Sequence, residues 1–156
     1  MEITDYLIEQ QGHDWGSILS EWHWLLPADL TVWMVNRFCD VIFVKEDGTV
    51  HLLDAGAGTV KKLAANREDF FGQVDLGDNA DNWFLISLTN QCVASGLVLH
   101  PGQCYSFKVP PVLGGKYELE NIVPADFAVT FSFLAQIHSQ TKDLPDGTPV
   151  NLVVGT

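Results

Sequence analysis

Basic residues are scarce in this sequence. Eight Lys and Arg stand against twenty Asp and Glu in 156 residues, which gives a formal net charge of -12. A molecule with this charge repels the phosphates of nucleic acids and the surfaces of anionic membranes. We therefore expect no direct binding to nucleic acid or to a membrane. The acidic composition favours either solubility alone or a strongly basic protein partner.

Long hydrophobic runs and clustered cysteines are also missing. No stretch reaches the roughly 18 apolar residues that a membrane span needs, and the start of the chain has no basic region followed by an apolar run. These absences predict a cytoplasmic protein. Cys39, Cys92 and Cys104 are too scattered for a disulfide framework or a zinc site, and the histidines are widely separated. We expect no metal and no cofactor.

Sequence motifs of catalysis are absent or incomplete. The run 56–61, Gly-Ala-Gly-Thr-Val-Lys, fits neither the phosphate-loop pattern nor the dinucleotide-binding pattern. No residue occupies the nucleophile position of a G-x-S-x-G elbow. His51 and Asp54, with Asp40 as a third member, form a candidate acid–base group, but residues three apart on one strand point to opposite faces. We therefore expect that this protein is not an enzyme.

The strongest structural pattern is a β-hairpin. β-Branched and aromatic residues predict strands at 41–44 and 50–53, and Asp47-Gly48 is typical of a two-residue turn between them. With that turn, Val44 lies opposite His51. Both faces of the hairpin carry apolar residues, so we expect it inside a sheet that is covered on both sides.

Periodicity predicts the remaining elements. Helices are expected where apolar residues recur at helical spacing, at 15–25 after the cap Asp14, from Asn66 through Phe71, at 80–95 up to Gly96, and at 127–142 after the cap Asp126. Further strands are expected at 31–35, 59–63, 104–109, 116–122 and 150–154, and the acidic run 75–81 is expected to be a loop. This order predicts one α+β domain over residues 1–156, with helices packed on a largely antiparallel sheet.

The most distinctive stretch is 101–122, which is dense in aromatics, prolines and glycines. Its prolines and glycines interrupt regular strand pairing, which predicts a surface loop, and such loops often carry recognition. Trp24 lies off the apolar stripe of the first helix and is a second candidate contact. The other candidate contact residues belong to the distinctive stretch: Tyr105, Pro110, Pro111, Gly114, Gly115 and Tyr117.

Several motifs in the chain resemble those of a known family. They are Asn36-Arg37-Phe38, His51-Leu52-Leu53-Asp54, Gly56-Ala57-Gly58 and Leu113-Gly114-Gly115. Over about residues 24–153, the chain resembles bacterial proteins built on the C-terminal domain of type VI secretion DNase immunity proteins. The resemblance implies a small immunity-type α+β protein that occupies a toxin and blocks its active site. Full-length proteins of this kind carry an additional N-terminal domain, of which this sequence shows only a short helix.

The leading hypothesis is a non-enzymatic, acidic binding protein, of the immunity type, that neutralises a basic toxin or nuclease. We expect a monomer or a weak homodimer. The alternative is a small-ligand-binding or enzymatic site in a pocket formed by His51, Asp54 and Tyr105. A third reading is a structural module of a larger assembly. Asp54 and Arg37 are expected to support the fold, with the Asp54 carboxylate accepting loop amides and the Arg37 guanidinium within reach.

Overall fold

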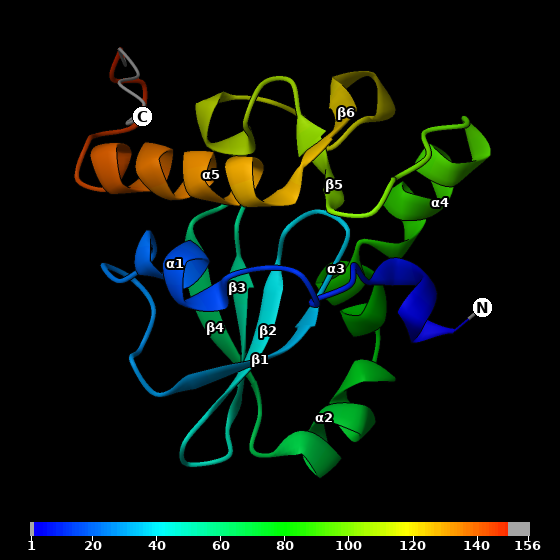
Figure 1. The fold of residues 1–156 in the computed structure, drawn as a ribbon, viewed down its shortest axis with the longest axis vertical. Coiled ribbons are helices and arrows are strands. Elements are labelled where there is room, and N and C mark those ends of the chain that lie inside the picture. Colours follow the sequence, from blue (N-terminus) through cyan, green and yellow to red (C-terminus); the bar gives the residue numbers. More distant parts are fainter. Residues whose placement is uncertain (1, 150–156) are drawn as a thin grey trace.

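The computed structural model describes residues 2–149 and centres on an antiparallel sheet (Figure 1). Within these residues the sheet contains four strands in sequential order: β1 (Leu30–Val35), β2 (Val41–Lys45), β3 (Val50–Asp54) and β4 (Thr59–Ala64). Buried apolar residues follow one another along β2, so the sheet needs cover on both faces. The predicted α+β class is confirmed.

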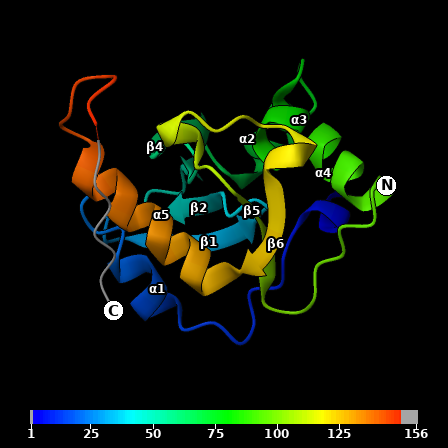
Figure 2. The ribbon, with the colours of Figure 1, turned by 90° about the horizontal axis from the view of Figure 1, so that it is seen from above.

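Helices cover both faces of the sheet (Figures 1 and 2). In the described residues they are α1 (Trp15–Ser20), α2 (Arg67–Val74), α3 (Asn79–Phe84), α4 (Ile86–Ala94) and α5 (Phe127–Thr141), with 3-10 turns η1 (Ile3–Tyr6), η2 (Pro111–Leu113) and η3 (Leu119–Asn121). Phe43 packs in one core cluster with Phe131 of α5. Its neighbour Ile42 points to the opposite face and packs in a second cluster with Phe70 of α2. The alternation along β2 thus divides the core between two layers.

A small antiparallel pair lies beside α5. It consists of β5 (Gln103–Phe107) and β6 (Ile122–Asp126), and Gln103 is paired with Asp126. Figure 2 shows β6 between α5 on one side and α3 and α4 on the other. Residues 108–121 connect the two strands, and we call them the signature loop. They contain η2 and η3 but no strand.

The predicted helix caps are confirmed. The side chains of Asp14, Asn66 and Asp126 each accept a hydrogen bond from a backbone N–H in the first turn of their helix. The first helix, however, is shorter than predicted. It ends at Ser20, and the chain continues through tight turns that place Trp22 completely inside the core.

The predicted register of the β2–β3 hairpin is wrong by one residue. Lys45 N–H donates to the Thr49 carbonyl at 3.0 Å, so the loop contains three residues, 46–48. Gly48 ends this loop with φ +86°, the left-handed conformation that a three-residue hairpin loop needs. Val44 therefore lies opposite Val50, and Phe43 lies opposite His51.

The predicted helix over 80–95 is two helices. Leu85 takes φ +49° between α3 and α4 and so ends the first helix. The acidic run 75–81 is only partly a loop, because α3 begins at Asn79 inside it. The predicted stop at Gly96 is confirmed by its φ of +87° and by the hydrogen bond from Leu97 N–H to the Cys92 carbonyl.

The predicted strand over 116–122 is also wrong. The Asn121 side chain bonds backbone groups of the signature loop, and regular pairing begins only at Ile122. The prediction did not foresee that one amide side chain would replace a ladder of backbone bonds. The predicted strand over 150–154 lies outside the described residues.

Candidate functional site

The turn between β3 and β4 is packed too tightly for side chains at its glycines. A Cβ on Gly56 would lie 2.6 Å from the Tyr117 hydroxyl, and a Cβ on Gly58 would lie 2.6 Å from the ring of His138. Gly58 also has φ +70°, a conformation that favours glycine. The Gly56-Ala57-Gly58 motif therefore brings the signature loop and α5 against the end of the sheet. We call this contact the glycine junction.

His138 anchors α5 to the glycine junction. Its Nε2 atom lies 2.7 Å from the Ala55 carbonyl oxygen. A carbonyl only accepts hydrogen bonds, so Nε2 carries the proton and donates. The side chain is 3% exposed, and burial lowers the pKa of His138 below its ordinary value. The imidazole is therefore neutral at pH 7.

Asp40 is a buried carboxyl group beside the glycine junction. It accepts hydrogen bonds from Asn36 Nδ2 and from Ala55 N–H, both at 2.9 Å. Burial, and then the negative charge of Asp54, raise the pKa of Asp40 to about 7, although the two hydrogen bonds oppose the shift. Asp54 itself accepts a hydrogen bond from Ala57 N–H at 3.0 Å. Two carboxyl groups thus hold the turn by its backbone amides.

Asn121 holds the signature loop together. Its side chain accepts from Val109 N–H and donates to the carbonyls of Val109 and Lys116, all at 2.9 Å. A Cβ on Gly115 would overlap the Val109 carbonyl, so only glycine allows this close approach. Packing therefore explains Gly115, whereas Gly114 takes the left-handed conformation, with φ +95°.

The signature loop presents an apolar surface. Val109, Val112 and Tyr117 are each more than two-fifths exposed. Pro111 and Val112 also line a groove of about 670 Å³, whose other wall is the segment after α5 that includes Leu144. The Tyr117 ring meets Phe107 edge-on, while burial of its hydroxyl, together with Asp54 and Asp40, raises the pKa of Tyr117. Tyr117 thus belongs both to the glycine junction and to the outer surface.

Two candidate contact residues from the sequence are buried. Tyr105 is 1% exposed and donates from its hydroxyl to the Leu97 carbonyl. Pro110 is buried as well. Cys104 and Tyr105 point to opposite faces of β5 and pack in two different core clusters, so this part of the strand is covered on both faces. Trp24 is half-buried and stacks on Trp22 with ring centroids 5.9 Å apart.

The alternative pocket formed by His51, Asp54 and Tyr105 does not assemble. The His51 ring lies 2.8 Å from the Thr49 hydroxyl, while Asp54 bonds the turn at the far end of β3. Tyr105 and His51 line separate hollows, and Asp54 lines neither of them. The expectation that His51 and Asp54 do not meet as a dyad agrees with this arrangement.

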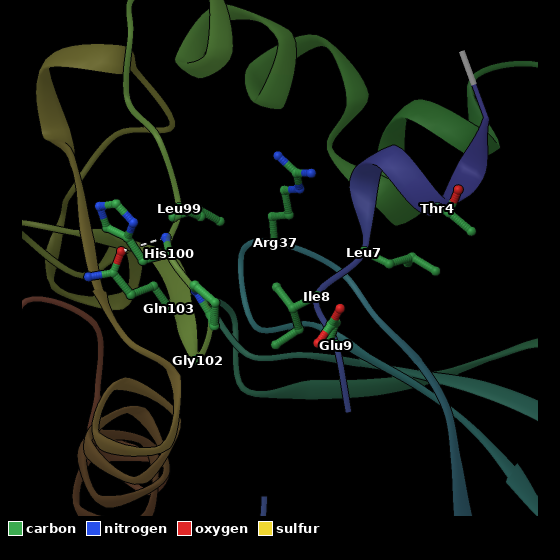
Figure 3. Close-up of a pocket in the computed structure, with 10 residues that line it drawn as sticks. Thr4, Leu7, Ile8, Glu9, Arg37, Leu99, His100, Gly102 and Gln103 are labelled. Carbon is green, nitrogen blue, oxygen red and sulfur yellow. Dashed lines mark hydrogen bonds between the residues drawn. The ribbon is translucent and has the colours of Figure 1, made fainter. Parts of the chain in front are cut away.

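Arg37 lies in a cleft away from Asp54, contrary to the predicted pairing. This cleft of about 360 Å³ runs between the N-terminal segment and the turn before β5 (Figure 3). In Figure 3 the Arg37 side chain projects into the space between Leu99 and the segment that carries Thr4. Within the described part of the chain, Asp54 accordingly makes no ion pair with Arg37. Of the predicted interaction, only the hydrogen bond from a loop amide to the Asp54 carboxylate is present.

Sequence reasoning missed the residues that hold this region together. They are His138, Asn36 and Asn121, and Asp40 was considered only for acid–base work. Signals existed for two of them: His138 falls on the buried face of the predicted last helix, and Asn36 immediately follows a strand. No local pattern distinguishes Asn121 from an ordinary loop asparagine.

The structure contains no arrangement typical of a metal centre or a membrane span in residues 2–149. In this part of the chain, three or more His, Cys, Asp or Glu side chains do not gather at any point where they could hold an ion. No helix of the described residues combines the length and hydrophobicity needed to cross a membrane.

Comparison with solved structures supports the fold. The crystal structure of Atu4351 from Agrobacterium tumefaciens matches 78% of this chain with a TM-score of 0.55 and 18% sequence identity. The match covers 62% of Atu4351, so the present chain spans less than two thirds of that protein. At this identity the likeness concerns the fold alone. No curated protein matches this sequence significantly.

A family comparison is more specific. Residues 64–138 match the model of the T6SS immunity protein Tdi1, C-terminal domain. The matched range begins at the end of β4 and ends at His138, so it includes the signature loop and Tyr117 but not Gly56 or Gly58. The resemblance inferred from the sequence is thus confirmed over residues 64–138, which are similar to the C-terminal domain of the T6SS immunity protein Tdi1.

Proposed function

We propose that this protein is a non-enzymatic immunity protein that binds and neutralises a basic toxin effector of a type VI secretion system. The match of residues 64–138 to the Tdi1 family carries this proposal. The resemblance of the sequence to DNase immunity proteins makes a nuclease the favoured toxin. A nuclease needs a basic cleft for its phosphate backbone substrate, and a protein of charge -12 is attracted to such a cleft.

The charge distribution supports a basic partner. Asp40 is the only acidic residue that is buried among residues 2–149, and most other carboxylates are exposed. These residues contain one ion pair, between the exposed side chains of Lys142 and Asp143. Most surface carboxylates are therefore not neutralised by a paired cation. Their negative electrostatic potential raises the rate of association with a basic protein.

The signature loop is the proposed contact surface. Val109, Val112 and Tyr117 give it an exposed apolar centre, and the exposed carboxylates of Glu118 and Glu120 follow directly in the chain. An apolar centre with a charged rim is the usual composition of a protein interface. Of the contact residues expected from the sequence, Pro111, Gly114, Gly115 and Tyr117 remain in this proposal.

A bacterial competition experiment tests the immunity function. Deleting the gene should make the native host sensitive to its own parent strain, and the same deletion strain should survive a parent whose type VI secretion is disabled. Expression of this chain in the deletion strain should restore survival. A deletion strain that competes equally against both parents would contradict the proposal.

Salt-dependent capture tests the nature of the partner. The tagged protein should retain a basic toxin from the host lysate at low ionic strength and lose it at high ionic strength. Val112→Arg should weaken this capture, whereas Val98→Arg, at a still more exposed valine outside the signature loop, should weaken it much less. Equal effects of the two variants would remove the signature loop from the interface.

The cellular and oligomeric expectations belong to the same proposal. An immunity protein that meets a DNase toxin at its target acts in the cytoplasm, as a monomer or weak homodimer in this proposal. Fractionation of the host and light scattering of the purified chain test these two points. The single domain over residues 1–156 also stays a prediction, which limited proteolysis tests.

A further inference from the structure

Helix α2 presents an aromatic side chain to solvent. Phe71 is 55% exposed, although its ring meets Trp33 and Phe70 edge-on, each with a centroid distance of 5.7 Å. The Arg67 guanidinium lies 5.5 Å from the centre of the Trp33 ring. Exposed aromatic and Arg side chains are enriched in protein interfaces. Figure 1 shows α2 at the end of the sheet opposite to α5, so the proposed toxin contact does not account for this surface.

Three residues of α2 follow one another along one face of the helix. Arg67, Phe71 and Asp75 are spaced four residues apart, which places them in one stripe. Asp75 belongs to it because the residue continues the helical backbone, with φ -82° and ψ -6°. All three side chains are exposed. This surface, which we call the α2 stripe, runs from a cation through an aromatic ring to an anion.

The two charges of the α2 stripe have no ionic partner in the described chain. Neither Arg67 nor Asp75 takes part in an ion pair within residues 2–149. Asp69 already accepts two hydrogen bonds from its neighbours, and Glu68 is exposed at the edge of the stripe. An occupant that satisfies Arg67 and Asp75 together must carry an anion and a cation on either side of an apolar group.

A second copy of this chain has that arrangement when its α2 helix runs antiparallel to the first. A twofold axis through Phe71 brings the two Phe71 rings together. Arg67 of each copy then lies opposite Asp75 of the other, because both residues are about 6 Å along the helix from Phe71. Two identical charge pairs flank one apolar contact. The α2 stripe is therefore complementary to itself.

We propose that two copies of this chain form a homodimer through their antiparallel α2 stripes. The proposal selects the homodimer from the two oligomeric states expected above, and it does not depend on toxin binding. The dimer is weak, because two molecules of charge -12 repel each other and Glu68 brings a further carboxylate towards Asp75 of the other copy. At physiological ionic strength the Debye length of about 8 Å screens the distant charges more than the pairs in contact.

Exchange of the charges tests this pairing. In sedimentation of the full chain at physiological ionic strength, Arg67→Glu and Asp75→Arg should each weaken self-association at least about tenfold, because each sets like charges opposite each other. The two variants mixed in equal amounts should associate about as tightly as wild type, since opposite charges then meet at both positions. A mixture that stays monomeric where wild type dimerises would overturn the proposal. So would a wild type that is monomeric up to about 1 mM.

Two further variants examine the apolar contact and the edge of the stripe. Phe71→Ser should abolish self-association, whereas Val93→Ser, at a 56% exposed valine of α4, should leave it unchanged. Glu68→Gln should tighten the dimer about threefold, because it removes a repulsion. Thermal melting checks that each variant is folded. Equal effects of the two serine substitutions would overturn the proposal.

The same charge variants distinguish a dimer from a second toxin contact. If Arg67→Glu and Asp75→Arg leave self-association unchanged but alter the capture of a basic toxin in opposite directions, the α2 stripe contacts the toxin and the proposal is wrong. The competition experiment is independent of these outcomes, because a monomer can also neutralise a toxin.

Discussion

The sheet and the signature loop keep their shapes by different interactions. In the sheet, buried apolar residues on both faces of β2 and β3 share the stabilising contacts. In the signature loop, a single side chain, Asn121, makes three hydrogen bonds, and Gly115 permits the close approach that they need. Many weak contacts tolerate a substitution, whereas a few specific contacts do not. The glycine junction joins these two kinds of structure.

The largest expected effect concerns the glycine junction. Gly58→Ala combines the strain of φ +70° with an overlap of the new Cβ and the buried His138 ring. We expect a loss of about 3 kcal/mol in the free energy of unfolding, measured by chemical denaturation. Gly48→Ala is the matched control, because Gly48 has φ +86° with no atom within 4 Å of a Cβ. It should cost about 1 kcal/mol. Equal losses would show that His138 does not confine the turn.

The second prediction concerns pH. In the native protein the pKa of Asp40 is raised to about 7, so its carboxyl group stays protonated up to about that pH. In the unfolded chain the same group loses its proton above about pH 4. The native state therefore binds more protons in this window, and the contribution of Asp40 to stability falls as pH rises from about 4 to 7. The lowered pKa of His138 acts in the opposite direction, because stability is lost as pH falls below about 6.5.

Asp40→Asn separates these two contributions. The wild type should lose stability as pH rises from about 5 to about 7.5, whereas the variant lacks the titrating carboxyl. The difference in free energy of unfolding, variant minus wild type, should therefore increase by about 2 kcal/mol over this range. The comparison requires denaturation curves for both proteins at several pH values. Parallel pH profiles for wild type and variant would show that Asp40 titrates normally.

The contrast between sheet and loop also explains what the sequence could predict. The strands of the β2–β3 hairpin follow from their β-branched and aromatic residues, and the caps Asn66 and Asp126 follow from their position before periodic runs. These are local signals. The α+β class followed from them without tertiary information.

The errors arose where distant contacts decide the local structure. Leu85 adopts a left-handed conformation between α3, whose Phe84 packs in one core cluster, and α4, whose Leu88 packs in another, and no Gly or Pro marks the break. Tyr105 lies in a strand whose buried side the sequence did not reveal. The glycine junction brings together residues from 54 to 138, and no local pattern connects them. The motifs that supported the resemblance thus mark tertiary packing.

A smaller effect is expected from the signature loop. Asn121→Ala removes all three hydrogen bonds of that side chain, and we expect a loss of about 1–2 kcal/mol because the groups left behind are close to water. Hydrogen exchange should accelerate in the signature loop and stay unchanged in β2 and β3. An equal acceleration in the sheet would contradict the independence of the two regions.

The smallest expected effect is that of Asp54→Asn. The new amide oxygen can still accept from Ala57 N–H, and within residues 2–149 Asp54 makes no ion pair that the substitution would remove. The substitution also removes the negative charge that raises the pKa of Asp40. We therefore expect a change below about 1 kcal/mol at pH 7 and a lower apparent pKa for Asp40 in the stability profile. A loss of about 3 kcal/mol would mean that the charge of Asp54 itself holds the turn, and the glycine junction would then depend on one carboxylate as the signature loop depends on Asn121.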